Sequence, residues 1–271
     1  MSRSGPLSGK VAVVTGGGRG VGRAISLALA GAGAHVHVVA RTPAPLAATV
    51  ASIEERGGTA TATAVDVTRI EAVLEELKPA VERVSGPPQI LVNAAGVFGP
   101  IALLPDTDPR AWIETINVNT IAPYLTCRAF LGGMLGAGWG RIVNVSSAAA
   151  LHPPGPLNTA YATSKVALNH LTRGLAAGLA GTGVTANVIH PGEVKTDMWR
   201  YIRDEAERLG PIGEGYRDWA RWIGESGGDS PEKAADLVLS LMSEEAGAIS
   251  GQFLWIRGGL QAPIPVTWDA T

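Results

Sequence analysis

The sequence predicts an α/β protein built on a doubly wound, seven-stranded parallel sheet with helices on both faces. Short runs rich in β-branched residues alternate with longer amphipathic runs along the 271 residues. Parallel neighbours need crossover connections, so alternation of strand and helix is typical of a parallel sheet. The strand runs are apolar at nearly every position, as expected where both faces of a sheet are covered. No linker or repeat divides the pattern, and we predict a single domain over residues 1–271.

Each element follows from its local pattern. Strands are expected at residues 11–14, 36–39, 61–65, 90–92, 142–145, 185–189 and 253–256. Helices are expected near residues 21–32, 44–57, 69–84, 109–137, 160–181 and 231–243. The stretch 198–228 breaks the alternation, because it lies between a strand and the last expected helix and is rich in aromatic residues.

Composition argues against several classes of function. An apolar content of 46% with 17% charged residues can bury a large core. The net charge is −2 and the charges are spread along the chain, which disfavours a nucleic-acid partner. The first residues lack the apolar region of a signal peptide, and no apolar run reaches the ~18 residues of a membrane span. We therefore expect a cytoplasmic protein without membrane contact.

The residues that bind metals or form disulfides are sparse. Cys127 is the single cysteine, which rules out a disulfide within the chain and a thiolate metal cluster. Its apolar helical surroundings favour a core residue over a reactive thiol. His35 and His37 alternate along a strand, and the remaining histidines lie far apart in the sequence without ligand spacing. No metal site is expected.

A glycine-rich turn follows the first expected strand directly. Residues 15–22 read Thr-Gly-Gly-Gly-Arg-Gly-Val-Gly and lead into a helix. This is where a doubly wound sheet presents a turn and a helix N-terminus to a pyrophosphate, and a β-carbon there would block the approach. The position favours a nucleotide site in a Rossmann-like domain over a plain tight turn, although the spacing differs from the usual dinucleotide fingerprint.

The end of the second expected strand bears on the choice of dinucleotide. An NAD enzyme of this architecture places an acidic residue there to accept hydrogen bonds from the ribose. This chain instead reads Ala-Arg-Thr at residues 40–42, and Arg41 offers a planar fork suited to a phosphate. Arg19 of the glycine turn could reach the same place. NADP(H) is therefore preferred over NAD(H), the alternative being two arginines on a solvated rim.

Five further motifs follow in order. They are Asn-Ala-Ala-Gly at 93–96, Asn-Val-Asn at 117–119, Asn-Val-Ser-Ser at 144–147, Tyr-Ala-Thr-Ser-Lys at 161–165 and Pro-Gly-Glu-Val-Lys-Thr at 191–196. A Tyr and a Lys four residues apart are neighbours on any helix, so that pair alone also fits a solvated surface. Together with the glycine turn, the order and spacing resemble the short-chain dehydrogenase/reductase family from about residue 8 to 260.

The resemblance implies a catalytic set of Asn119, Ser147, Tyr161 and Lys165. Tyr161 would exchange a proton with the substrate, and the Lys165 ammonium, aided by an oxidised nicotinamide ring, would lower a tyrosine pKa from its usual value near 10. Ser147 would donate a hydrogen bond to the substrate carbonyl, and Asn119 would hold a water in a proton path behind Lys165. Lys165 would also bind the nicotinamide ribose.

A set of cofactor-binding residues is implied in the same way. The set is Gly16, Gly18, Arg19, Gly20, Val21, Gly22, Arg41, Thr42, Asp66, Val67, Asn93, Ala94, Gly96, Tyr161, Lys165, Pro191, Gly192, Val194 and Thr196. Within it, Asp66 and Val67 would border the adenine, and Asn93, Ala94 and Gly96 would line the floor of the groove. Capping of the following helix is the alternative role for Asp66.

Residues 198–228 correspond to the segment that folds over the nicotinamide in this family. They hold five of the chain's fourteen aromatic residues, Trp199, Tyr201, Tyr216, Trp219 and Trp222. Such rings favour a bulky hydrophobic or aromatic ketone as substrate, unless they only pack this lid onto the rest of the protein. The substrate contacts expected are Ser147, His152, Tyr161, Met198 and Trp199.

Two positions depart from the family pattern. Ser147 precedes Tyr161 by fourteen residues, one more than is general in the family, and we place the extra residue in the loop 151–157, with Ser146 as the alternative serine. Residues 175–178 read Leu-Ala-Ala-Gly and lack the arginine with which the fatty-acid-synthesis reductases of the family bind an acyl carrier protein.

The resulting expectation is an NADPH-dependent carbonyl reductase or hydroxy dehydrogenase acting on a small molecule. NAD-dependent alcohol oxidation by the same site and a non-catalytic NADP(H) sensor are the alternatives. The apolar, proline-bearing residues 258–265 suggest a subunit contact, and a homotetramer or homodimer is expected from the family.

Overall fold

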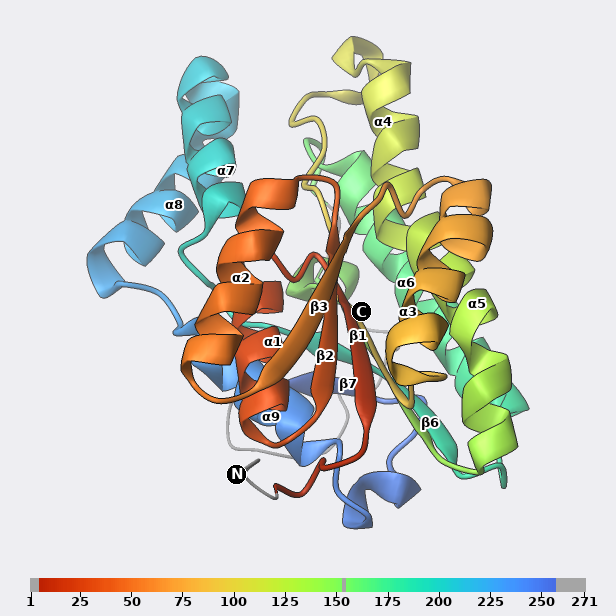
Figure 1. Ribbon diagram of the computed structural model, residues 1–271. Helices are drawn as coiled ribbons and strands as arrows, with labels where there is room; N and C mark the ends of the chain where they lie inside the picture. The colour runs from red at the N-terminus through yellow and green to blue at the C-terminus, as the bar shows by residue number, and fades with distance from the viewer. Residues whose placement is uncertain (1–4, 153–154, 257–271) are drawn as a thin grey trace.

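The structure, a computed structural model, describes residues 5–152 and 155–256. Within them the chain forms one seven-stranded parallel sheet in the order β3-β2-β1-β4-β5-β6-β7 (Figure 1). The strands are β1 (Val11–Thr15), β2 (His35–Ala40), β3 (Thr59–Ala64), β4 (Ile90–Asn93), β5 (Gly140–Val145), β6 (Val184–His190) and β7 (Phe253–Trp255). The predicted fold class is confirmed, and each strand ends within two residues of its expected bounds.

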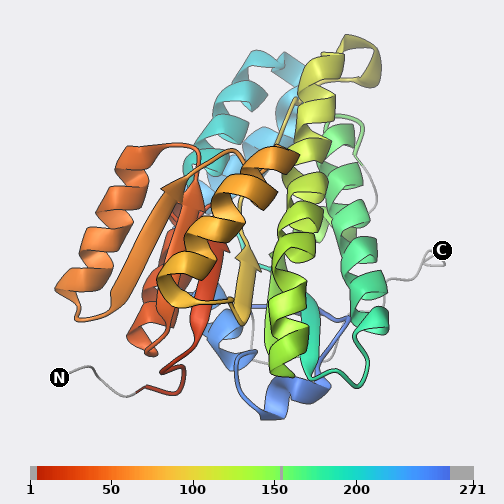
Figure 2. The same ribbon diagram turned by 45° about the vertical axis from the view of Figure 1, so that its right-hand side comes forward.

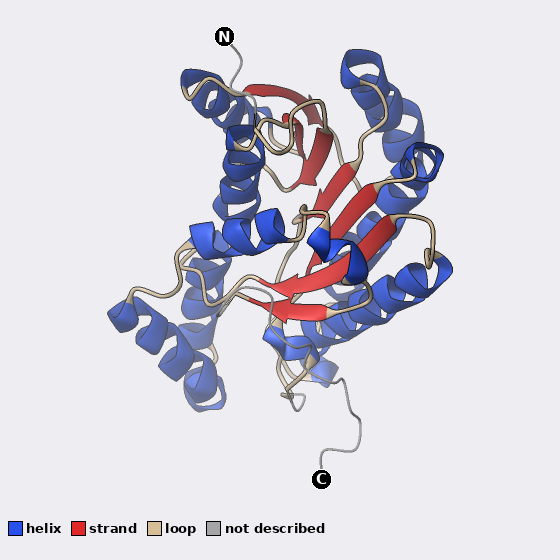
Figure 3. Cartoon of the chain, turned by 90° about the horizontal axis from the view of Figure 1, so that it is seen from below, coloured by secondary structure: helices blue, strands red, loops and turns tan. Residues whose placement is uncertain are grey.

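Helices cover both faces of the sheet (Figures 2 and 3). One face carries α1 (Gly20–Gly31), α2 (Pro43–Glu55) and α9 (Pro231–Ser240). The other carries α3 (Lys78–Ser85), α5 (Ala122–Ala137) and α6 (Thr159–Gly178). Alternate strand residues such as Val13 and Val14 enter opposite cores, because successive side chains of a strand point to opposite faces. Burial of both faces explains why the central strands are apolar at most positions, whereas the edge strand β3 alternates threonine with alanine and is partly exposed.

Two of the expected helices contain π turns. The run 69–84 becomes η1 (Ala72–Leu77) followed by α3, and the run 109–137 becomes α4 (Pro109–Ile116), η3 (Asn117–Ile121) and α5. A π turn inserts a residue into a helix and is frequent at functional sites. Short 3₁₀ segments complete the connections, η2 (Leu104–Asp106), η4 (Ala148–Ala150), η5 (Gly210–Gly213) and η6 (Glu245–Ala248).

The aromatic-rich stretch 198–228 forms a pair of helices that lie beside one another, α7 (Asp197–Arg208) and α8 (Glu214–Ser226) (Figure 1). The pair begins and ends at one place, because Val194 and Asp229 form a parallel bridge. The Asp229 N–H also donates to the Glu193 carbonyl at 2.9 Å. The two ends of this lid are therefore tied to each other.

The structure also bears on the expectations for Cys127, residues 258–265, membrane spans and metal sites. The Cys127 thiol is buried, and burial raises its pKa to about 12, which confirms a core residue rather than a nucleophile. Residues 258–265, expected at a subunit contact, lie outside the described residues. In the part of the chain that the structure describes, no helix has the length and apolar character needed to cross a bilayer. The same residues hold no group of three or more side chains placed to bind a metal.

His35 and His37 form a ladder with threonines of the neighbouring strand. His37 lies between Thr61 and Thr63 of β3, with 2.8 Å from Nδ1 to the Thr61 Oγ1 and 2.8 Å from Nε2 to the Thr63 Oγ1. The His35 Nε2 is 3.0 Å from the Thr61 Oγ1. Burial and, to a lesser extent, the charge of the neighbouring His35 together lower the pKa of His37 from 6.5 to about 4. His37 is thus held in its neutral form inside the fold.

The folded protein should consequently become less stable as the pH falls from about 6.5 to 4. Between about pH 6.5 and 4 the unfolded chain binds a proton at His37 that the folded protein does not, so acid favours unfolding by up to about 3 kcal/mol. Urea unfolding at pH 7 and pH 4.5 measures the loss. His37→Gln should remove most of the additional acid sensitivity, whereas His170→Gln, at an exposed position on α6, should leave it in place. Equal acid sensitivity in all three proteins would contradict this assignment.

Candidate active site

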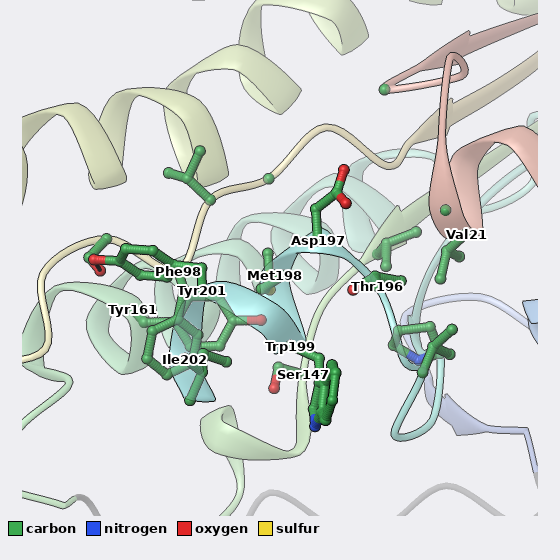
Figure 4. A pocket seen from close by; sticks show the side chains of 18 of the residues that line it. Val21, Phe98, Ser147, Tyr161, Thr196, Asp197, Met198, Trp199, Tyr201 and Ile202 are labelled. Carbon is green, nitrogen blue, oxygen red and sulfur yellow. Dashed lines mark hydrogen bonds between the residues drawn. The ribbon is translucent and has the colours of Figure 1, made fainter. Parts of the chain in front are cut away.

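A cavity of about 1770 Å³ runs along the carboxyl ends of the strands. It starts at the turn between β1 and α1, crosses the ends of β4 and β5, and reaches the lid helices. β1 and β4 are neighbours in the sheet although their connections continue in opposite directions, and ligands of doubly wound sheets bind at such a switch point. Figure 4 shows Val21 and Thr196 at one end of the pocket and Phe98, Tyr161 and Ile202 at the other.

The glycine turn fits a dinucleotide pyrophosphate. Gly16 has a φ of +68°, and a β-carbon there would lie 2.7 Å from the Ala95 nitrogen. A β-carbon on Gly22 would lie 2.3 Å from the Gly16 carbonyl oxygen, so both positions require glycine. α1 starts at this turn without a side-chain cap. Its first N–H groups are suited to phosphate oxygens, since a helix N-terminus attracts anions.

The two arginines predicted near the adenosine both contact carboxylates. Arg41 Nη1 lies 3.8 Å from Glu114 Oε1 of α4, and Arg19 Nη1 lies 3.0 Å from Asp197 Oδ2 at the start of α7. The sequence around Arg41 has no acidic residue, so the carboxylate beside it comes from a distant segment. All four side chains are about half exposed or more, which leaves both arginines accessible to a ligand.

The remaining cofactor residues line the cavity with one exception. Asp66 and Val67 lie in its wall, and Asp66 Oδ1 also accepts hydrogen bonds from the N–H and hydroxyl of Thr68, at 3.0 and 2.8 Å. Asn93 does not reach the surface of the cavity. Its amide donates to Asn144 Oδ1 at 2.9 Å and accepts from the Thr126 hydroxyl at 2.7 Å. Asn93 therefore lies beneath the floor and fixes β4 to β5 and α5.

Tyr161 and Lys165 lie on one face of α6, and both are buried. Lys165 Nζ donates to the Val145 carbonyl at the end of β5, at 2.8 Å, and lies 5.7 Å from the centre of the Tyr161 ring. The Tyr161 ring stacks on Phe98 with 4.5 Å between centroids. The i, i+4 pair is thus an interior contact at the cavity wall, and the alternative of a solvated surface pair is excluded.

The pKa of Tyr161 differs from the expectation drawn from its lysine neighbour. Burial raises the pKa to about 12; the hydrogen bond with Ser147 opposes this shift, and the charge of Glu193 adds to it. Burial lowers the pKa of Lys165 to about 8. In the protein by itself, desolvation of the phenolate outweighs the Ser147 hydrogen bond. Tyr161 is a neutral phenol at neutral pH, which is the form that donates a proton.

The hydrogen bond with Tyr161 also distinguishes between the two serines after β5. Ser147 contacts the phenol, and its Oγ also accepts from the Ala149 N–H at 3.2 Å. Ser146 Oγ is buried and has no hydrogen-bond partner among the described residues. The extra residue before Tyr161 was placed in the loop 151–157, of which residues 153–154 lie outside the described chain.

Asn119 occupies the π turn η3 and does not line the cavity. Its Oδ1 accepts from the Val97 N–H at 2.9 Å, and its amide donates to the Val97 carbonyl and to the Ser164 hydroxyl at 2.8 and 2.9 Å. Both amide N–H groups are therefore committed to the protein. The amide donors of Asn119 are thus not available to the water that the sequence analysis expected behind Lys165.

Four of the five lid aromatics line the cavity. Tyr216 and Trp219 line the apolar end of the cavity, where Phe98, Leu157 and Ile202 form its other walls. Trp199 and Tyr201 also reach the cavity but are tied to the protein, by hydrogen bonds of 3.2 Å to the Ala220 carbonyl and 2.9 Å to the Gly99 carbonyl. Trp222 is exposed and does not line the cavity.

His152 and Met198, expected at the substrate, also line this cavity. The sequence analysis missed Phe98, Leu157, Ile202 and Glu193. Phe98 lies two residues after the Asn-Ala-Ala-Gly motif and Glu193 lies within Pro-Gly-Glu-Val-Lys-Thr, so both had a local signal. The other two had none, because only the fold brings them to the site.

Comparison with known proteins agrees with this geometry. The family model of the short chain dehydrogenases matches residues 10–207. The chain belongs to the short-chain dehydrogenase family. This short-chain dehydrogenase is 41% identical over 196 residues to a short chain dehydrogenase of Pseudocercospora fijiensis, covering 72% of this chain and 62% of that one. It is 38% identical to the short-chain reductase protein NovJ of Streptomyces niveus, covering 92% and 93% of the two chains.

Solved structures with the same fold contain either dinucleotide. An NADPH complex of actinorhodin polyketide ketoreductase has a TM-score of 0.83 and 29% identity, with 91% of this chain and 95% of that chain covered. An NAD⁺-bound xylitol dehydrogenase has a TM-score of 0.84 and 28% identity, with 94% and 100% covered. This short-chain dehydrogenase therefore belongs to a family of oxidoreductases that bind nicotinamide cofactors.

Removal of the Tyr161 hydroxyl should abolish turnover without loss of cofactor binding. The phenol is buried at the cavity wall, and loss of a positioned proton donor costs about 10²–10⁴ in rate, so Tyr161→Phe should lower kcat by at least about 10². Steady-state kinetics and a fluorescence titration with NADPH measure the two effects. Tyr124→Phe, on the exposed side of α5, is the matched control and should keep full activity. Unchanged turnover in Tyr161→Phe would refute the assignment.

Proposed function

We propose that this protein is an NADPH-dependent carbonyl reductase that acts on bulky hydrophobic or aromatic ketones, and that it oxidises the corresponding secondary alcohols in reverse. The observation that carries the proposal is a buried, neutral Tyr161 phenol, hydrogen-bonded to Ser147, at the wall of a cavity lined by aromatic rings. A neutral phenol suits the reductive direction, in which the site must give up a proton.

The proposed roles follow from these positions. When bound, the reduced nicotinamide supplies a hydride to the carbonyl carbon. Ser147 would donate a hydrogen bond to the carbonyl oxygen, and Tyr161 would transfer its hydroxyl proton to that oxygen, which yields a neutral alcohol. The Lys165 ammonium, fixed by the Val145 carbonyl, would stabilise the phenolate that remains and bind ribose hydroxyls. Asn119 would keep this region of the fold in place through Val97.

The preference for NADPH rests on the adenosine end. Arg41 and Arg19 both line the cavity, and an Arg guanidinium binds a phosphate through two parallel hydrogen bonds. Glu114, beside Arg41, would compete with such a phosphate. The second candidate is therefore NAD-dependent oxidation of an alcohol by the same site, which the NAD⁺-bound xylitol dehydrogenase also favours.

The substrate class rests on the apolar end. Phe98, Tyr216 and Trp219 offer ring faces and edges to a ligand, and Phe98 and Tyr216 meet edge to face at 5.8 Å. Aromatic side chains of this kind bind large apolar or cyclic ligands. Two similar proteins, actinorhodin polyketide ketoreductase and NovJ, are by their names a ketoreductase and a reductase. Their names support reduction of a ketone as the reaction type.

A panel of ketones tests the reaction and the substrate class. Consumption of NADPH should be faster with ring-bearing ketones such as acetophenone and tetralone than with acetone, by at least about tenfold in kcat/KM, because each ring buries apolar surface in the cavity. The absorbance of NADPH and of NADH at matched concentrations gives the rates. Turnover of sugar alcohols with NAD⁺ and none of these ketones would favour the second candidate.

Arg41→Ala tests the cofactor preference. Loss of a charged hydrogen-bonding partner should weaken NADPH binding by at least about tenfold and leave NADH binding unchanged, because only NADPH carries the additional phosphate. Fluorescence titrations of both nucleotides measure the change. Arg128→Ala, on the exposed face of α5 away from the cavity, serves as the control. An equal loss for both nucleotides would argue against a phosphate contact at Arg41.

A further inference from the structure

The carboxylate of Glu193 lies between the cavity wall that carries Tyr161 and Ser147 and the lid helices α7 and α8. It is the third residue of the Pro-Gly-Glu-Val-Lys-Thr motif and lines the cavity. Its Oε2 accepts a hydrogen bond from the Trp219 indole of α8 at 3.1 Å, and its Oε1 lies 3.7 Å from the His190 Nε2 at the end of β6. Its side chain keeps 28% of its surface exposed, so part of the carboxylate remains accessible from the cavity.

The main chain holds this side chain in a fixed position. The Glu193 N–H donates to Asp229 Oδ2 at 3.0 Å, and its carbonyl accepts from the Asp229 N–H at 2.9 Å. The flanking Gly192 has a φ of +83°, and a β-carbon there would lie 2.2 Å from Ile256. Since backbone and side chain are both held, Glu193 cannot move far to avoid a ligand.

Apolar surroundings strengthen the electrostatic effect of the Glu193 carboxylate. The nearby walls of the cavity are apolar, with Phe98, Leu157 and Ile202 packed together. Charges interact more strongly where water is scarce, and the charge of Glu193 also raises the pKa of Tyr161. The negative potential of Glu193 therefore extends to the place where the ketone must bind.

Several other charged groups in and beside the lid engage partners of their own. Arg19 and Arg200 both pair with Asp197, toward the cofactor end of the cavity. Lys195 Nζ lies over the Trp199 ring at 5.0 Å, and Asp229 Oδ1 pairs with Lys233 at 2.8 Å. At the apolar end, the Glu193 carboxylate contacts both the Trp219 ring of the lid and His190 at the end of β6.

We propose that Glu193 determines which substrate charge the enzyme prefers. The enzyme accepts ketones that bear a cationic or hydrogen-bond-donating group and rejects anionic ketones such as aryl keto acids. An anion entering this pocket would lose hydration and meet a fixed negative charge, whereas an ammonium or hydroxyl group would gain a partner. The proposal rests on the carbonyl reductase function proposed above and names the substrate class of that same site.

Matched acetophenones test it. The 3- and 4-isomers of methylacetophenone, acetylbenzoate and acetylbenzylamine share one reacting group and differ in charge. For each compound, the isomer with the higher kcat/KM is compared. The wild-type enzyme should favour acetylbenzylamine over acetylbenzoate by at least about tenfold in kcat/KM. Glu193→Gln should reduce that ratio by at least about tenfold, with methylacetophenone as the uncharged reference for each variant; the amide oxygen can still accept from Trp219.

Two further variants keep the test decisive. Glu193→Asp retains the charge and should retain the preference, whereas Glu207→Gln removes an exposed charge of α7 outside the cavity and should have no effect on the ratio. Thermal melting reports whether each variant is folded. A ratio that is the same in wild type and Glu193→Gln overturns the role of Glu193 while methylacetophenone is still reduced. Failure of wild type to reduce methylacetophenone with either nucleotide overturns the proposed function and this proposal with it.

Discussion

The hydrogen bond from Lys165 to the Val145 carbonyl is the contact on which the candidate site depends. It joins α6 to the end of β5, which brings Tyr161, one helical turn before Lys165, next to Ser147, two residues after Val145. A buried ammonium is costly unless it is hydrogen-bonded, so this contact makes the buried position of Lys165 tolerable. Without it, one link between α6, which carries Tyr161 and Lys165, and the end of β5, which precedes Ser147, would be lost.

Two opposing effects set the state of Tyr161. Desolvation and the charge of Glu193 raise its pKa, and the Ser147 hydrogen bond lowers it. Desolvation prevails, so the Tyr161 phenol remains protonated at the cavity wall. Behind this wall, Asn119 fixes the π turn to Val97, and Asn93 links two strands to α5. These buried amides give the site rigidity, because fully paired polar groups tolerate little displacement.

The cavity has two chemically different ends, and the fold explains both. At the β1 end, glycines leave space against neighbouring backbone, and a helix N-terminus with two arginines favours phosphate. At the lid end, ring side chains from α8 and the loop after β4 enclose an apolar volume with Glu193 at its edge. The bridge between Val194 and Asp229 closes the base of the lid, so α7 and α8 are held over the cavity as one unit.

By itself the sequence determined the seven strands and the order of the motifs, because hydrophobic periodicity and glycine turns are local properties. The family resemblance of those motifs indicated the catalytic and cofactor-binding residues. It did not reveal the two lid helices, whose aromatic residues gave no clear period, or the Glu114 carboxylate beside Arg41, which comes from a distant helix. The tertiary structure alone decided that Ser147 rather than Ser146 contacts the phenol, that Asn93 lies beneath the floor, and that the pKa of Tyr161 rises. Burial and contacts between distant segments govern these features, and both arise only when the chain has folded.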